Sequence, residues 1–156
     1  MTLLAWMIGL VLPACGAEGI AGLPMPAPID LATLERPSTP NTFLAGPAGS
    51  QPAPDVVLQP FAMPAAALYE AARVTFGQRE RTFVAAEFPG RMQLHYVVRS
   101  ALINYPDLVT VQIHALDGTH STMTVWSRSV YGHRDFGVNR ERTEAWLAAL
   151  PRPESK

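Results

Sequence analysis

The chain has 156 residues, of which 48% are hydrophobic, so it is long enough to bury the core of one ordinary domain. Its formal net charge is −1 and it has no run of basic residues, which excludes nucleic acid as a partner because phosphates require a concentrated positive face. The single cysteine, Cys15, excludes an intramolecular disulfide.

Residues 1–23 form an apolar segment of the kind that targets a protein to a membrane. The run from Leu3 to Ala17 is uncharged. It is shorter than the roughly 20 apolar residues of a membrane-spanning helix, so a signal-type segment fits it better. Residues 12–15, Leu-Pro-Ala-Cys, also resemble a bacterial lipobox, which makes Cys15 a candidate for lipidation. A lipoprotein leader, a cleaved signal peptide and a single anchor helix stay open, and each predicts a domain on the outer, periplasmic side of a membrane.

Residues 24–60 hold most of the 15 prolines and show no sustained helical or strand period. Proline interrupts a helix and removes a hydrogen-bond donor from a central strand. We therefore expect a proline-rich linker, an extended spacer between the membrane segment and the domain, whose apolar end packs on the domain.

The folded domain is predicted over residues 61–150, followed by a short tail at 151–156. A helix is expected from Pro64 to Phe76, because Leu68, Ala72 and Phe76 share one face. Four runs with strand character follow, separated by turn signals, at residues 81–88, 91–102, 108–116 and 121–130. They predict a four-stranded antiparallel meander.

Alternating apolar residues fix the register of the last two strands. If residues 117–119 form a three-residue loop, Ile113 lies opposite Met123 and Val111 lies opposite Val125, which keeps the apolar side chains on one face. The opposite face is then polar. A final helix from Arg140 to Leu150, with Asn139 as its N-cap, is expected on the apolar face beside the first helix. The predicted fold is α+β with two layers, two helices packed on one face of the sheet.

The turn before the final helix is dense in arginine. A positive charge in the first helical turn is disfavoured by the helix dipole, so Arg140 and Arg142 need compensation. One interpretation is a structural cluster in which Asp135 pairs with Arg134, Arg140 and Arg142. The other is an anion site, in which these arginines and the N–H groups at the helix start hold a carboxylate or phosphate. Gly137 fits either interpretation as a sharp turn.

The same part of the chain resembles a known family. The stretches at residues 39–45, 97–100 and 105–113, and above all "SRSVYGHRDFGVNRERTEAWLAAL" at residues 127–150, are similar to the bacterial and plastid family known as domain of unknown function 1499. The resemblance covers roughly residues 37–150, and it implies an exported or membrane-anchored protein but no activity, cofactor or catalytic residue. The residues that match the family pattern are Arg99, Ser127, Arg128, Ser129, Asp135, Gly137, Asn139 and Arg140.

Standard catalytic and metal-binding patterns are missing. The four histidines show no zinc-ligand spacing, no serine lies on a nucleophile elbow, and no phosphate-binding glycine loop or dinucleotide fingerprint occurs. We therefore expect no catalytic residue, no metal and no cofactor.

Two functional hypotheses stay open. The first is a membrane-tethered extracytoplasmic binding or interaction module that recognises an anionic ligand, a lipid headgroup or a partner protein. Its candidate residues are Arg99, Trp126 and Arg128 on the polar face, with Arg134, Arg140 and Arg142 at the turn. The alternative is a small envelope hydrolase or transferase that uses the turn from His133 to Arg140. A cleft lined by that turn favours the enzyme.

Overall fold

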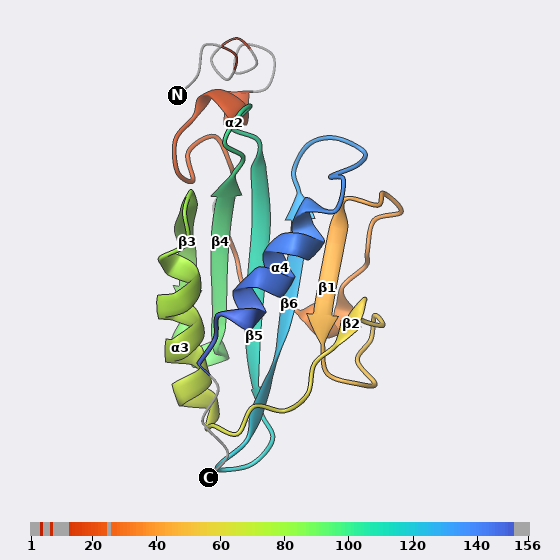
Figure 1. The fold of residues 1–156 in the computed structure, drawn as a ribbon, viewed down its shortest axis with the longest axis vertical. Helices are drawn as coiled ribbons and strands as arrows, with labels where there is room; N and C mark the ends of the chain where they lie inside the picture. Colours follow the sequence, from red (N-terminus) through yellow and green to blue (C-terminus); the bar gives the residue numbers. More distant parts are fainter. Residues whose placement is uncertain (1–3, 5–6, 8–12, 25, 152–156) are drawn as a thin grey trace.

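Within the described residues, a six-stranded mixed sheet with strand order β2-β1-β6-β5-β4-β3 lies at the centre of the domain, and two helices cover one of its faces (Figure 1). The computed structural model describes residues 4, 7, 13–24 and 26–151. The strands are β1 (Thr42–Gly46), β2 (Val56–Val57), β3 (Thr82–Phe88), β4 (Gln93–Arg99), β5 (Pro106–Ala115) and β6 (Ser121–Ser129). The helices are α2 (Pro13–Gly16), α3 (Ala65–Gly77) and α4 (Val138–Ala148), with 3-10 turns at Leu31–Thr33 and Pro89–Arg91.

The predicted α+β class is confirmed, but the four-stranded antiparallel meander describes only part of the sheet. Strands β3 to β6 follow one another in antiparallel pairs, as the turn signals predict. The strand β1 then pairs antiparallel with β6, and β2 pairs parallel with β1, which makes the sheet mixed. As a result β6, which the meander would leave at an edge, is an interior strand.

The expectation that residues 24–60 form only an extended spacer is wrong, because they contain the buried strand β1. Pro40 and Pro47 flank this strand and no proline interrupts it, so its N–H groups remain available for pairing. The side chains of Phe43, Leu44 and Ala45 are all less than 10% exposed. Apolar burial against β6 therefore places part of the proline-rich segment inside the fold.

The predicted register between β5 and β6 is confirmed. Ile113 lies opposite Met123, and Val111 lies opposite Val125. The connecting turn is closed by the carboxylate of Asp117, which accepts hydrogen bonds from the backbone N–H groups of Thr119 and His120. Hydrogen bonds from Thr119, and then from His120, lower the pKa of Asp117 to about 2.

Both long helices pack on the same face of the sheet, as predicted, and the core lies between them and the strands. The rings of Phe76 in α3 and Trp146 in α4 stack with their centroids 4.9 Å apart, and Tyr96 of β4 meets both edge-on. Pro64 is the N-cap residue of α3. Its backbone is extended and its ring restricts φ, so the helix begins at the next residue, Ala65.

The opposite face of the sheet, called the far face here, is covered by the chain before β1. Figure 1 shows this segment leaving α2 and passing behind the sheet, on the side away from α3 and α4. We call residues 14–24 and 26–34 the N-terminal strap. The amide group of Gln93 in β4 holds it by accepting from the backbone N–H of Ile29 at 2.8 Å and donating to the Ile29 carbonyl at 2.7 Å. The polar face is thus a second packing surface.

Of the membrane segment expected over residues 1–23, residues 1–3, 5–6 and 8–12 lie outside the described residues. In the part that the structure does describe, no helix has the length and apolar character needed to cross a membrane. Cys15, the lipidation candidate, is buried in α2, and burial raises the pKa of its thiol. The tail beyond Pro151 is also outside the described residues.

Candidate functional site

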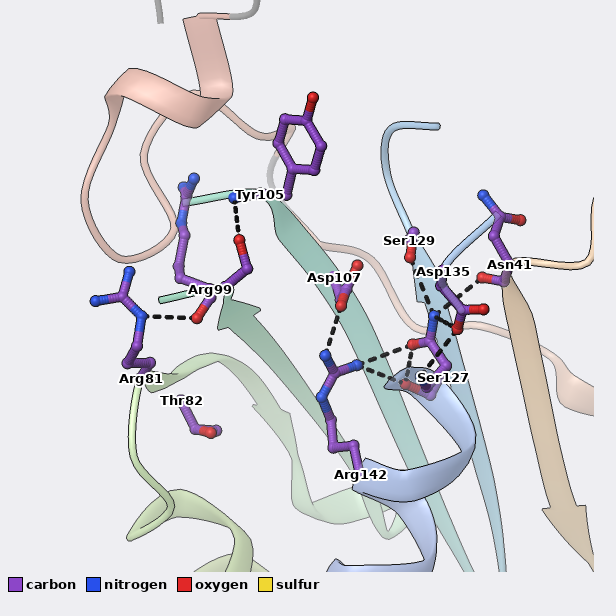
Figure 2. A network of polar contacts seen from close by, with 12 residues as sticks. Asn41, Arg81, Thr82, Arg99, Tyr105, Asp107, Ser127, Ser129, Asp135 and Arg142 are labelled. Carbon is purple, nitrogen blue, oxygen red and sulfur yellow. Dashed lines mark hydrogen bonds and ion pairs between the residues drawn. The ribbon is translucent and has the colours of Figure 1, made fainter. Parts of the chain in front are cut away.

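Arg142 points inward from α4 and forms a buried ion pair with Asp107 of β5 (Figure 2). The distance from Nη2 to the Asp107 Oδ2 atom is 2.5 Å, and the two side chains are only 10% and 9% exposed. The same guanidinium donates from Nη1 to Ser127 Oγ at 3.1 Å and to Asn139 Oδ1 at 2.9 Å. Arg142 therefore attaches α4 to two neighbouring strands.

Asn139, the second residue of α4, is fully buried and extends these contacts to Asn41, just before β1, and to the turn that precedes α4. Its Nδ2 donates to the Asn41 carbonyl, to Ser129 Oγ and to Asp135 Oδ2, at 2.8 to 3.0 Å. Its Oδ1 accepts from Ser127 Oγ at 2.5 Å. We call this set the buried polar network: Asn41, Asp107, Ser127, Ser129, Asp135, Asn139 and Arg142.

The prediction that Asn139 is the N-cap of the last helix is wrong. The helix begins at Val138, and the carboxylate of Asp135 accepts from the backbone N–H groups of Gly137 and Asn139 at 3.1 and 2.9 Å. Burial by itself would raise the pKa of Asp135, but its hydrogen bonds with Asn139 and Gly137 outweigh burial and lower it. Gly137 has φ +86°, a left-handed conformation that glycine adopts without a steric cost.

The other two arginines of the turn lie outside the buried polar network. The Arg140 side chain is 66% exposed and pairs with Glu144 along the helix at 2.9 Å. Arg134 is exposed in the turn. Only Arg142 points into the network, so the turn does not gather its three arginines around one anion.

Arg99 is buried on the far face, where the N-terminal strap surrounds its guanidinium. It donates to the backbone carbonyls of Gly19 and Ala21 at 2.9 and 3.0 Å, and also to that of Ala14. Among the described residues it has no carboxylate partner, and burial lowers its pKa. Asn104 adds two contacts to the strap by donating to the carbonyls of Cys15 and Ala17.

Arg81 contacts both Arg99 and Asn104, so these three side chains together support the start of the strap. Arg81 donates from Nε to the Arg99 carbonyl at 2.7 Å, which Figure 2 shows, and from Nη2 to Asn104 Oδ1 at 2.7 Å. Trp126 is also covered, because its ring packs with Leu31 and Leu44 and is 2% exposed. Two of the three far-face residues predicted to meet a ligand, Arg99 and Trp126, therefore hold the strap instead.

The third, Arg128, lines a pocket of about 470 Å³ between the strap and the far face. In the sheet Arg128 of β6 lies beside Leu108 of β5, and Leu108 lies beside Val97 of β4. In this row of three residues Arg128 is therefore the one charged side chain, next to two apolar ones. No hydrogen bond or ion pair to the Arg128 side chain occurs among the described residues. Burial lowers its pKa, so this guanidinium is partly desolvated, and the described part of the chain supplies no counter-ion for it.

The described residues show no catalytic arrangement. Ser127 and Ser129 both direct their hydroxyls into the buried polar network, and Asp135 is occupied by the N–H groups that it caps. No cluster of three or more histidine, cysteine, aspartate or glutamate side chains that could hold a metal is present in the described part of the chain.

The architecture defines a small two-layer α+β domain that carries a ligand-sized pocket on its helix-free face. The chain belongs to the family described as Protein of unknown function (DUF1499), whose model matches residues 32–150, and this confirms the resemblance. No curated protein and no solved structure matches the chain. The family match covers the sheet and both long helices but only the last few residues of the strap.

Several residues of these sites were missed by the sequence analysis. Asp107 is a charged residue at a position that strand alternation assigns to the apolar face, in phase with Val109 and Val111, and this is the signal that could have found it. Gln93 falls on the face that alternation predicts to be polar, so it gave no such signal. Asn41, Asn104 and Arg81 gave no such signal. Their roles depend on strap and strand positions that local patterns do not predict.

Proposed function

We propose that this domain is a non-enzymatic binding module that holds a small anionic ligand at Arg128 on the far face. One observation carries the proposal: a half-buried guanidinium lines an apolar pocket and has no partner among the described residues. Desolvating an arginine costs free energy unless a counter-charge compensates for it, and a bound carboxylate or phosphate supplies that charge.

The alternative, an envelope hydrolase or transferase at the turn from His133 to Arg140, has less support. The acid of that turn, Asp135, uses its carboxylate to cap α4. A pocket of about 390 Å³ adjoins the turn and is lined by Asp135, Gly137 and Arg140. His133 and Arg134 are exposed and do not line it, so among the described residues this pocket has no histidine that could act as a base. A general base must lie within hydrogen-bond reach of a nucleophile, and the serines nearest in sequence are committed to the buried polar network.

We further propose that the module works on the outer side of a membrane, tethered through its N-terminus. The support is the uncharged run from Leu3 to Ala17 with Cys15 near its end. Mass spectrometry of the mature N-terminus tests this: a lipid mass on Cys15 that is absent from Cys15→Ser supports a lipoprotein, and an unmodified Met1 in the soluble fraction contradicts tethering.

The binding proposal is tested by titrating the full chain with butyrate, octanoate and inorganic phosphate while following backbone amide chemical shifts. We expect saturable shifts around residues 97, 108 and 128 for at least one anion. Arg128→Met should abolish them, because it removes the charge but keeps an apolar side chain of similar length. Arg73→Met, an exposed arginine on α3, is the matched control and should bind as the wild type does. Unsaturable shifts with every anion, or equal binding by Arg128→Met, would contradict the proposal.

A further inference from the structure

We infer that the ligand of the far-face pocket is an amphiphile with one anionic headgroup and an unbranched apolar chain, a long-chain carboxylate in chemical terms. This inference rests on the proposed function and names its ligand class. It depends on what surrounds Arg128 rather than on Arg128 alone.

The wall of the pocket carries one charge. Among the described residues, Arg128 and His95 are the only side chains of the wall that can become cationic, and none is an acid. Burial lowers the pKa of His95, so its imidazole is neutral at pH 7. One guanidinium compensates one monoanionic headgroup. A polyanion such as a nucleotide would leave phosphate charges without partners, which is costly in an apolar setting.

The remainder of the wall is mostly apolar and comes from two separate parts of the chain. The sheet contributes Val97 and Leu108, in the same row as Arg128. The strap contributes Ile20, Leu23 and Ile29 together with three prolines, at residues 24, 26 and 28. A hydrocarbon chain between these two surfaces would lose its contact with water on both sides.

The size of the pocket fits such a ligand. Its volume of about 470 Å³ lies within the range of roughly 300 to 1,000 Å³ that is usual for pockets holding small organic molecules. The headgroup and the hydrocarbon chain of the ligand would then be recognised by different segments of the protein. The headgroup would contact β6, which lies inside the family match, and much of the hydrocarbon chain would contact the strap, which lies mostly outside it. We therefore expect the preference for an anion to belong to the family domain, and the preference for a hydrocarbon length to be specific to this protein.

The test is a calorimetric titration of the full chain with butyrate, octanoate, decanoate, dodecanoate and the neutral dodecanol, all below the concentrations at which they form micelles. We expect affinity to rise about fourfold for each methylene that enters the pocket, which corresponds to about 0.8 kcal/mol. Dodecanoate should bind at least roughly 100-fold more tightly than butyrate.

Two variants separate the contribution of the headgroup to binding affinity from that of the hydrocarbon chain. Arg128→Met should weaken dodecanoate at least tenfold and change dodecanol less than threefold. Leu108→Trp, which fills the pocket floor beside Arg128, should weaken dodecanoate at least tenfold and change butyrate less than threefold. Arg73→Met, on the helical side of the sheet, serves as the control for both.

The possible failures are distinguishable. If butyrate and dodecanoate bind equally and both depend on Arg128, the anion site stands and the amphiphile inference is overturned. If dodecanol binds as tightly as dodecanoate and Arg128→Met changes neither, the pocket is purely apolar and the inference is again overturned. If no probe binds the wild type, the proposed function itself fails.

Discussion

At the scale of single residues, Arg142 and Arg99 compensate in different ways for the free-energy cost of burying a positive charge. Arg142 meets a carboxylate, that of Asp107, and completes its hydrogen bonding with Ser127 and Asn139. Arg99 has only backbone carbonyls around it, with no acid among the described residues. Among the described residues Arg128 has neither kind of partner, which is why we assign a ligand to it and not to the two more deeply buried arginines.

Replacing Arg142 by alanine should lower the free energy of unfolding by about 3 to 5 kcal/mol, because the Asp107 carboxylate stays buried without its partner. Urea unfolding measures the loss. Arg140→Ala is the control, and it should cost less than about 1 kcal/mol because its pair with Glu144 is exposed to solvent. Equal losses in the two variants would show that the buried polar network does not stabilise the turn.

At the scale of elements, β1 and the N-terminal strap decide what the sheet exposes. The strand β1 covers the edge of β6, and the strap covers the far face that a meander alone would leave to solvent. The strap is attached by hydrogen bonds from Gln93 at Ile29 and from Arg99 and Asn104 near α2, and by apolar packing of Leu31 on Trp126. A segment held by hydrogen bonds from a few side chains can be released by one substitution without disturbing the core between sheet and helices.

Gly22→Val should release the start of the strap. Gly22 has φ +77°, and a Cβ atom there would lie 2.9 Å from the Ala14 Cα atom, closer than real Cβ contacts. We expect amide hydrogen exchange in residues 14–24 and 26–30, including the Ile29 N–H bonded to Gln93, to become at least tenfold faster.

Gly49→Val is the matched control for this variant. Gly49 has a similar φ of +79°, but a Cβ atom at this position would have no neighbouring atom within 4 Å, so the substitution brings the same backbone strain without a collision. Exchange in the strap should stay at the wild-type rate. Unchanged exchange in Gly22→Val, or equal acceleration in both variants, would mean that the close approach to Ala14 does not hold the strap.

At the scale of the whole molecule, burial on both faces of the sheet makes stability depend on pH. Burial lowers the pKa of His95 and of His114, both on the far face, below the ordinary value of about 6.5. Below pH 6.5 the unfolded chain therefore binds more protons at these positions than the folded chain does. The stability that they contribute is complete above pH 6.5 and is lost as the pH falls through their lowered values.

Urea unfolding between pH 7.5 and pH 5 should accordingly show a falling free energy of unfolding. The effect of Asp117 and Asp135 belongs to a lower range, because their pKa values lie below the ordinary value of 3.8. His95→Gln should make the pH dependence shallower between pH 6.5 and 5. An unchanged slope in this variant, or an NMR titration of the His95 ring at pH 6.5 or above, would contradict the argument.

The fold was predictable where local patterns suffice and not where distant segments meet. Alternation along β5 and β6 fixed which residues face each other, and the spacing of Leu68, Ala72 and Phe76 fixed the inner face of α3. The candidate site was predictable only in part. Strand alternation placed Arg128 on the polar face of the sheet and so made it a candidate. The network around Asn139 could not be predicted in this way, because it depends on Asn41, which lies 98 residues away in the chain.

The sequence by itself determined the α+β class, the order of β3 to β6, the single apolar face that receives both helices, and the family, because each follows from short-range periodicity or from a contiguous motif. Only the tertiary structure decided that the proline-rich segment supplies an interior strand and a cover for the far face, and that Arg142 and Arg128 have different surroundings. The physical reason is that burial and pairing of a polar group depend on which distant segment removes its water, and local side-chain spacing does not contain that information.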